Sequence, residues 1–273
     1  MITIRHKETG EPLHEVAGDA LAGASLVHAI LLGADLRNAD LRAADLRWAD
    51  LCQADLRGAR LDGAILEAAD FTLSNVARAR FERARLADAR LQAVCLEESG
   101  AADVDFRGAD LARVNLKNSN LAGATFADAE MRRVDLTHVN LRQADLTGAN
   151  LTEVNFSYSN LQGADLSYAM LLDALFTGAD LREAVLRHAD LTFAVLNGVQ
   201  LAGADLSRSH FSQTVIARCR DVHLAKGLDT VEVLQPSSID LDTLRHSFWR
   251  VPDEVREAFG VDRATTNLVR EPG

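Results

Sequence analysis

The sequence predicts an all-β solenoid, in which the chain turns a corner every five residues and stacks one coil on the next. A large apolar residue recurs at every fifth position from Leu21 to Ile216, at thirty-nine of forty places, with Ala101 as the exception. A small residue stands two places before each large one, beginning with Ala24. A period of five fits neither an amphipathic helix nor an alternating strand, because these repeat about every 3.6 and 2 residues.

The composition indicates what fills the interior and what kind of partner the surface suits. Hydrophobic residues make up 48% of the chain but aromatic residues only 5%. The core must therefore be built mainly from leucine and alanine. The net charge of −11 argues against direct binding to nucleic acid and favours a basic protein partner.

The residue before each large apolar position is often Asp or Asn, which gives Ala-Asp-Leu at residues 34–36, 39–41 and 44–46. This A-(D/N)-L-X-X pattern resembles the pentapeptide-repeat family over residues 20–220. The resemblance implies a right-handed quadrilateral β-helix with four repeats in each coil. Forty repeats then give about ten coils and, at ~4.8 Å for each coil, a rod of roughly 48 Å. It also implies a protein-binding rod without enzymatic activity.

A solenoid needs a cap at each end, because its coils are stabilised only by their neighbours. Residues 1–19 predict an N-terminal β-hairpin cap. Ile2 and Ile4 alternate there with polar residues, and Gly10 supplies the turn.

The repeat fails after Ile216, so the solenoid is expected to end near residue 220. Residues 221–273 form a C-terminal extension in which 221–236 look irregular or partly extended. Two short helices should follow, the first capped by Asp240 and the second beginning at Pro252. The last dozen residues are expected to be mobile.

An apolar patch is expected near the C-terminal end of the rod, because residues twenty apart stack on one face. A contiguous exposed apolar patch marks an interface. Two roles of this patch stay open, and both can hold. In one, the tail helices fold back and cover the patch. In the other, the patch joins two copies of the chain through their C-terminal ends, as in topoisomerase-protecting members of the family. The patch comprises Met170, Leu172, Leu175, Phe193, Val195 and Val215 on the rod, and Leu244, Phe248, Trp249, Val255 and Phe259 on the tail.

Two adjacent faces of the predicted rod are acidic. The resemblance implies a DNA mimic that occupies bacterial DNA gyrase or topoisomerase IV and inhibits or protects it, giving quinolone or toxin resistance. Asp in this slot also belongs to the repeat pattern itself, whatever the function. The alternative is a structural interaction scaffold in stress or signalling, with the tail as a docking or dimerisation element. The acidic residues are Asp45, Asp105, Asp145, Asp165 and Asp205 on one face and Asp50, Asp70, Asp110, Glu130 and Asp190 on the next.

The sequence contains no nucleophile–base pair, phosphate loop or metal-ligand cluster, so no cofactor, metal or enzymatic activity is expected. Cys219 falls at a small inward position, whereas Cys52 and Cys95 lie beside central residues. With neither a signal peptide nor a membrane span in the pattern, the protein is expected in the cytoplasm.

One repeat is weak. The segment Glu97-Glu98-Ser99-Gly100-Ala101 loses its large central side chain in the middle of the rod. It predicts a kink, a bulge or a local packing defect.

Overall fold

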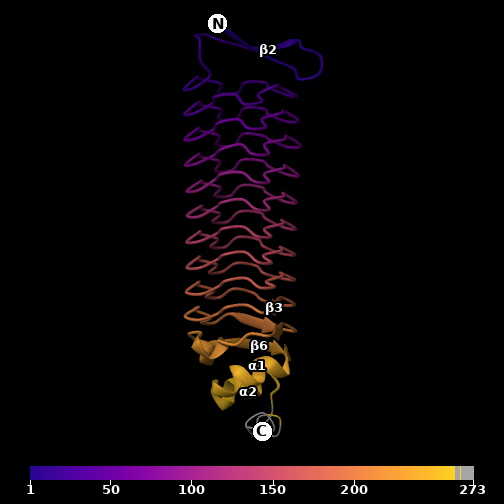
Figure 1. Ribbon diagram of the computed structural model, residues 1–273, viewed down its shortest axis with the longest axis vertical. Coiled ribbons are helices and arrows are strands. Elements are labelled where there is room, and N and C mark those ends of the chain that lie inside the picture. The colour runs from indigo at the N-terminus through magenta and orange to yellow at the C-terminus, as the bar shows by residue number, and fades with distance from the viewer. Residues whose placement is uncertain (262–264, 266–273) are drawn as a thin grey trace.

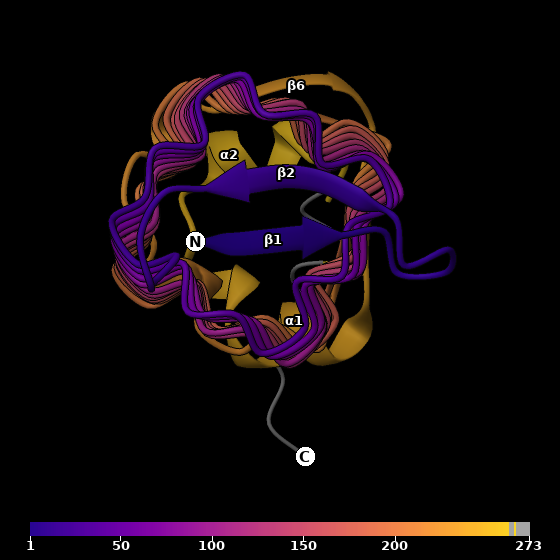
Figure 2. The same ribbon diagram turned by 90° about the horizontal axis from the view of Figure 1, so that it is seen from above.

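Parallel pairing between residues twenty apart builds the chain into a rod (Figure 1). The computed structural model describes residues 1–261 and residue 265. Bridges run along each side, for example from Asp45 to Ile65 and from Ile65 to Arg85. Because four five-residue repeats fill each twenty-residue coil, the rod has four sides when viewed along its axis (Figure 2). Coils are counted here from residue 21, so coil one is 21–40 and coil ten is 201–220.

Each corner depends on one residue in the left-handed conformation, two places after the central apolar residue. Trp48 has a φ of 56° and Tyr168 a φ of 61° there, although neither is glycine. Such a conformation costs roughly 1–2 kcal/mol for a side chain with a Cβ atom. The cost is offset by backbone hydrogen bonds, since the corner nitrogen of Trp48 donates to the carbonyl of Glu67 in the next coil.

The interior consists of stacked rows, and each coil adds one large and one small side chain on each of its sides. Leu46 and Ala44 are both completely buried, which confirms that the large and the small residue of a repeat point inward. Aromatic side chains stack within one row, with 5.1 Å between the ring centroids of Phe106 and Phe126. The small residue is required because the rod is too thin to hold two large side chains on each side.

The weak repeat neither breaks nor shifts the ladder. Gly100 keeps its bridges to the coils before and after it, and Ala101 remains buried. Neighbouring hydrogen bonds are long, however, at 3.3 Å from the Gly100 nitrogen to the Ala79 oxygen and 3.4 Å from Asn115 to Val94. Phe81, also buried, occupies the equivalent core position one coil earlier and adds volume beside the alanine. The defect is therefore a loosening and not a bulge.

A hairpin lies across the N-terminal end of the rod (Figure 2). Strand β1 (Ile2–Arg5) pairs antiparallel with β2 (Pro12–Val16). Ile4 and Val16 are buried against the core. The Asp35 nitrogen donates to the Arg5 carbonyl at 2.8 Å, so the hairpin also satisfies backbone groups of the first coil.

The tail adds one further, irregular coil to the opposite end. Residues 221–236, expected to be irregular or partly extended, contain the strand that pairs with the tenth coil on one side. A second short strand pairs on the next side, so the edges of the last repeats are covered. The strands are β3 (Val195–Asn197), β5 (Val215–Ala217) and β7 (Ser238–Ile239) in one parallel sheet, and β4 (His210–Ser212) with β6 (Glu232–Gln235) in another.

Two short helices close this end beneath the last coil (Figure 1). They are α1 (Leu241–His246) and α2 (Asp253–Ala258), with 3-10 turns at Val222–Leu224, Leu228–Thr230 and Phe248–Arg250. The Asp240 carboxylate accepts a hydrogen bond from the Thr243 nitrogen at 2.8 Å and so caps α1. Phe248 and Phe259 are buried, and the Phe259 ring meets Phe211 of the rod edge-on. The expected mobile end lies outside the described residues.

We predict that Phe248→Ala lowers the free energy of unfolding by about 3–5 kcal/mol, because it removes a fully buried ring from the cap. Leu241→Ala is the matched control in the same segment, since Leu241 is 61% exposed, and its effect should be within about 0.5 kcal/mol. Denaturant unfolding followed by circular dichroism measures both. Equal effects of the two substitutions would contradict the cap.

Candidate protein-binding surfaces

A band of apolar and aromatic side chains covers two neighbouring corners of coils eight to ten and the side between them. Tyr168 is 61% exposed, Met170 46%, Phe193 43% and Leu175 40%. A parallel bridge joins Leu175 to Val195. Strands β3 and β5 continue the same column, with Val195 opposite Val215. We call this the apolar band; it comprises Tyr168, Met170, Leu172, Leu175, His188, Phe193, Val195 and Val215.

Left-handed corner residues supply the most prominent side chains of the band. Tyr168, His188 and Phe193 all have positive φ angles, so their side chains project from the edges of the rod. The Tyr168 and His188 rings stack at 4.8 Å with 3° between their planes. This pair is not among the residues expected from the sequence. Its signal was present, because aromatic residues exactly one coil apart at corner positions are expected to stack.

The tail does not cover the apolar band. Leu244, Phe248, Val255 and Phe259 are buried within the end cap, below the last coil. The side chain of Trp249 lies outside the described part of the chain. The expectation that the tail folds back over the patch is therefore not met, since the tail extends the rod along its axis instead of returning along its side.

The acidic slot of each repeat has a structural role. The Asp165 carboxylate accepts a hydrogen bond from the Ser167 nitrogen at 2.9 Å, and Asp145 accepts from Thr147 at 3.0 Å. Asn150 makes the same contact with Thr152. A carbonyl-type oxygen is all that this turn requires, so Asp and Asn are interchangeable in it.

Several of the acidic residues are neutralised by arginines within their own repeat. The Arg47 guanidinium donates to both oxygens of Asp45, at 2.9 and 2.6 Å. This pairing holds the pKa of the Asp45 carboxyl below its usual range. Asp105 is held in the same way by Arg107.

The ten predicted acidic residues thus divide into two sets. Four of them have cationic partners: Asp45 with Arg47, Asp70 with Arg90, Asp105 with Arg107 and Asp205 with Arg187. The other six have no ion pair within the described residues; they are Asp50, Asp110, Glu130, Asp145, Asp165 and Asp190. Asp145 and Asp165 occupy bridged positions on adjacent coils. Uncompensated charge is therefore concentrated in the C-terminal half of these faces.

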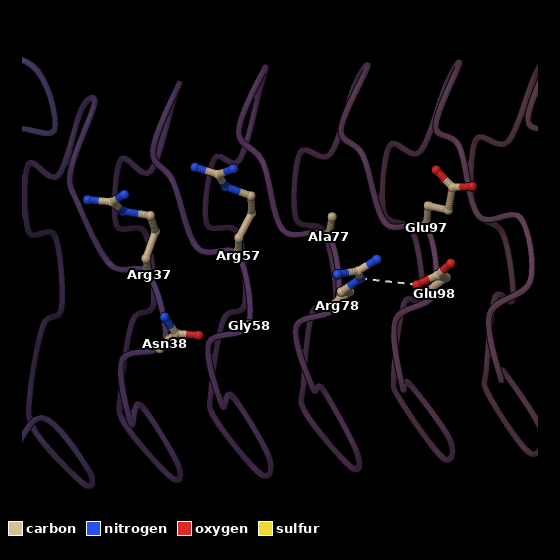
Figure 3. A pocket seen from close by; sticks show the side chains of 8 residues that line it. All are labelled: Arg37, Asn38, Arg57, Gly58, Ala77, Arg78, Glu97 and Glu98. Atoms are coloured by element: carbon tan, nitrogen blue, oxygen red, sulfur yellow. Dashed lines mark hydrogen bonds and ion pairs between the residues drawn. The ribbon is translucent and has the colours of Figure 1, made fainter.

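A hollow of about 540 Å³ lies on another side of the rod, over coils one to four (Figure 3). Gly58 and Ala77 provide its floor, because they carry little or no side chain. Its arginines are already engaged: Arg37 and Arg57 each hold an aspartate two residues earlier, and Arg78 pairs with Glu98 at 3.1 Å. This network of mutual pairs offers a ligand little free charge.

The remaining chemistry is sparse. No group of three or more His, Cys, Asp and Glu is placed to hold a metal ion within residues 1–261 and 265. Burial is the main cause that raises the pKa of the Cys52 thiol to about 12 and that of Cys219 to about 11, so both are poor nucleophiles. No helix in the described part of the chain is long and apolar enough to cross a membrane.

Comparison with known proteins identifies the repeats. The family model described as pentapeptide repeats matches in eight copies, over residues 21–58, 64–99, 102–137, 129–167 and 173–213. No curated protein sequence matches the chain.

One similar solved structure is HetL, a pentapeptide repeat protein involved in heterocyst differentiation regulation in the cyanobacterium Nostoc sp. strain PCC 7120. It is 28% identical, covers 73% of this chain and 86% of its own, and gives a TM-score of 0.44. A trypsin-treated variant of QnrB1, a plasmid-mediated fluoroquinolone resistance protein, is 18% identical over 88% of this chain and 95% of its own, with a TM-score of 0.40.

We predict that Asp165→Asn leaves the free energy of unfolding within about 0.5 kcal/mol, whereas Asp165→Ala lowers it by about 0.5–1.5 kcal/mol. Asparagine keeps the acceptor for the Ser167 nitrogen, and alanine removes it. Thermal and denaturant unfolding measure the difference. If asparagine were as destabilising as alanine, the charge and not the turn hydrogen bond would be the stabilising feature.

Proposed function

Because this chain belongs to the pentapeptide-repeat family, whose members fold as right-handed quadrilateral β-helices, we propose that it acts as a non-catalytic rod that binds a protein partner through the apolar band. One observation carries the proposal. Four large apolar or aromatic side chains of this band are between 40% and 61% exposed on two successive coils. Exposed apolar surface of this kind marks interaction sites on soluble proteins. The three unpaired cysteines suit a cytoplasmic site of action.

The charges around the apolar band favour a partner of a particular kind. Asp165, Asp173 and Asp190 lie among its residues, and none of the three has an ion pair within the described chain. Arg208 lies at the far edge, one coil beyond His188. A partner that presents apolar side chains with lysine or arginine around them would satisfy both features. A second copy laid face to face would instead bring like charges together.

Homodimerisation has a separate surface. Leu224, Leu234 and Leu241 are exposed by 53%, 68% and 61% around the C-terminal end of the rod. An end-to-end dimer would bury these leucines and leave the apolar band free. Sedimentation from 1 to 100 µM distinguishes this assembly from a monomer.

We predict that the double substitution Phe193→Ser and Leu175→Ser weakens partner binding at least 30-fold, because truncated hot-spot residues typically cost 2 kcal/mol or more. Leu73→Ser is the matched control. Leu73 is 61% exposed in the same corner column, six coils earlier. Affinity capture with quantitative mass spectrometry, followed by titration of the purified partner, measures the effect. Equal retention by the double variant and by Leu73→Ser would rule out the apolar band as the binding surface.

A type II topoisomerase is the second candidate partner. Asp145 and Asp165, stacked on adjacent coils without an ion pair in the described chain, favour it because they form a short row of negative charge. Four of the ten acidic residues are neutralised by Arg, which limits the resemblance of these faces to DNA, whose backbone carries one charge per ~1.7 Å.

A DNA gyrase supercoiling assay, with and without ciprofloxacin, tests this second candidate. Inhibition or protection is expected at micromolar protein, and Asp145→Asn with Asp165→Asn should weaken it while preserving the turns. Asp103→Asn is the control, because Asp103 lies outside this row, at the neighbouring corner and two coils before Asp145. No effect of the wild-type protein on supercoiling would exclude gyrase and leave the apolar-band proposal untouched.

A further inference from the structure

A second hollow, of about 390 Å³, is lined by three arginines on the corner of coils four to six. We call it the arginine hollow; its lining residues are Gln92, Ala93, Ala112, Arg113, Arg132 and Arg133. The two alanines leave space, because the other residues that line the hollow carry long side chains. The protein as a whole has a net charge of −11, so this concentration of guanidinium groups runs against its overall balance.

Arg113 has no acidic partner within the described residues, unlike two other arginines at left-handed corners. Arg78 and Arg133 also occupy left-handed corners, and each pairs with a glutamate one coil further on, at 3.1 Å to Glu98 and 2.8 Å to Glu153. The residue one coil beyond Arg113 is Arg133 itself. Two guanidinium groups therefore follow one another at this edge, and only Arg133 has a carboxylate partner within the described residues.

Arg132 has no ion pair within the described residues for a different reason, although it adds to the effect of Arg133 in lowering the pKa of Glu153. Elsewhere an arginine two residues after an acidic slot grips that carboxylate, as Arg107 grips Asp105 at 2.6 Å. The slot before Arg132 holds Glu130, whose carboxylate accepts a hydrogen bond from the Asn150 side chain at 2.9 Å. No ion pair joins Glu130 and Arg132 in the described structure. The longer glutamate side chain is thus engaged with the next coil instead of with its own arginine.

We propose that the arginine hollow binds a phosphate group. Guanidinium groups present several N–H donors in a planar fork, which suits the oxygens of a phosphate dianion. Two guanidinium groups from successive coils, neither held by a carboxylate within the described residues, can donate to different oxygens of one tetrahedral anion. Of the carboxylates nearby, Glu153 holds Arg133 through two hydrogen bonds, whereas Asp110 accepts a hydrogen bond from the neutral Gln92 side chain and keeps its charge. The hollow also leaves room for whatever carries the phosphate.

The test compares binding of inorganic phosphate with binding of a phosphoserine peptide and its unphosphorylated form. Backbone NMR shifts and thermal unfolding are recorded at constant ionic strength, with chloride as the reference anion. Saturable shifts confined to residues around 92–133 are expected from phosphate. Arg113→Gln and Arg132→Gln should each weaken binding about tenfold or more, since each removes charge-assisted hydrogen bonds. Arg142→Gln is the control, because Arg142 is also exposed and has no ion pair within the described residues.

The outcomes are distinct. Tighter binding of the phosphoserine peptide than of inorganic phosphate identifies a phosphorylated side chain as the natural source, and equal binding identifies the free ion. If phosphate shows no saturable binding, or if the double variant Arg113→Gln/Arg132→Gln binds it as well as Arg142→Gln does, the proposal is overturned. Both variants should unfold at the wild-type temperature in chloride. The apolar band lies on coils eight to ten, so failure here leaves the proposed function unaffected.

Discussion

The twenty-residue register is the constraint on which the rest of this structure depends. Each coil places the same repeat position directly above its predecessor, and the parallel hydrogen bonds hold only while this register lasts. Two of every five side chains must point inward, so their size is restricted. The other three face outward and are free to vary, provided that one of them accepts the left-handed corner. Core and surface are thereby almost independent of each other in this fold.

This separation explains why the acidic slot is a poor guide to function. Its carboxylate is first a hydrogen-bond acceptor for the following turn, as Asp165 is for Ser167. Whether the negative charge of this carboxylate is neutralised depends on the residue two places later or one coil away. An arginine two places later neutralises it, as Arg47 does at Asp45, and a threonine does not, as Thr147 at Asp145. The electrostatic surface is therefore decided by pairs of positions and not by the repeat itself.

Much of the rod could be predicted from the sequence, because periodicity alone assigns the inward residues. The column of Leu175, Val195 and Val215 followed from the same arithmetic. The extra coil formed by the tail did not, since residues 221–240 pair through their backbone without repeating the side-chain pattern. The arginine hollow could not be predicted from the sequence either. It depends on Glu130 turning toward Asn150, a choice between two hydrogen-bond partners that spacing does not reveal.

The long hydrogen bonds near the weak repeat affect how the rod resists deformation. At about 3.3–3.4 Å, the contacts of Gly100 with Ala79 and of Asn115 with Val94 resist deformation less than those at 2.7 Å, such as Leu146 with Asp165. In a solenoid each coil is held by its neighbours, so deformation begins where the hydrogen bonds between coils are weakest. The ladder is therefore expected to open more easily at these two contacts than along the contacts at 2.7 Å. The coils before and after the weak repeat would then keep their own register and their own surfaces, because each coil contacts only its neighbours.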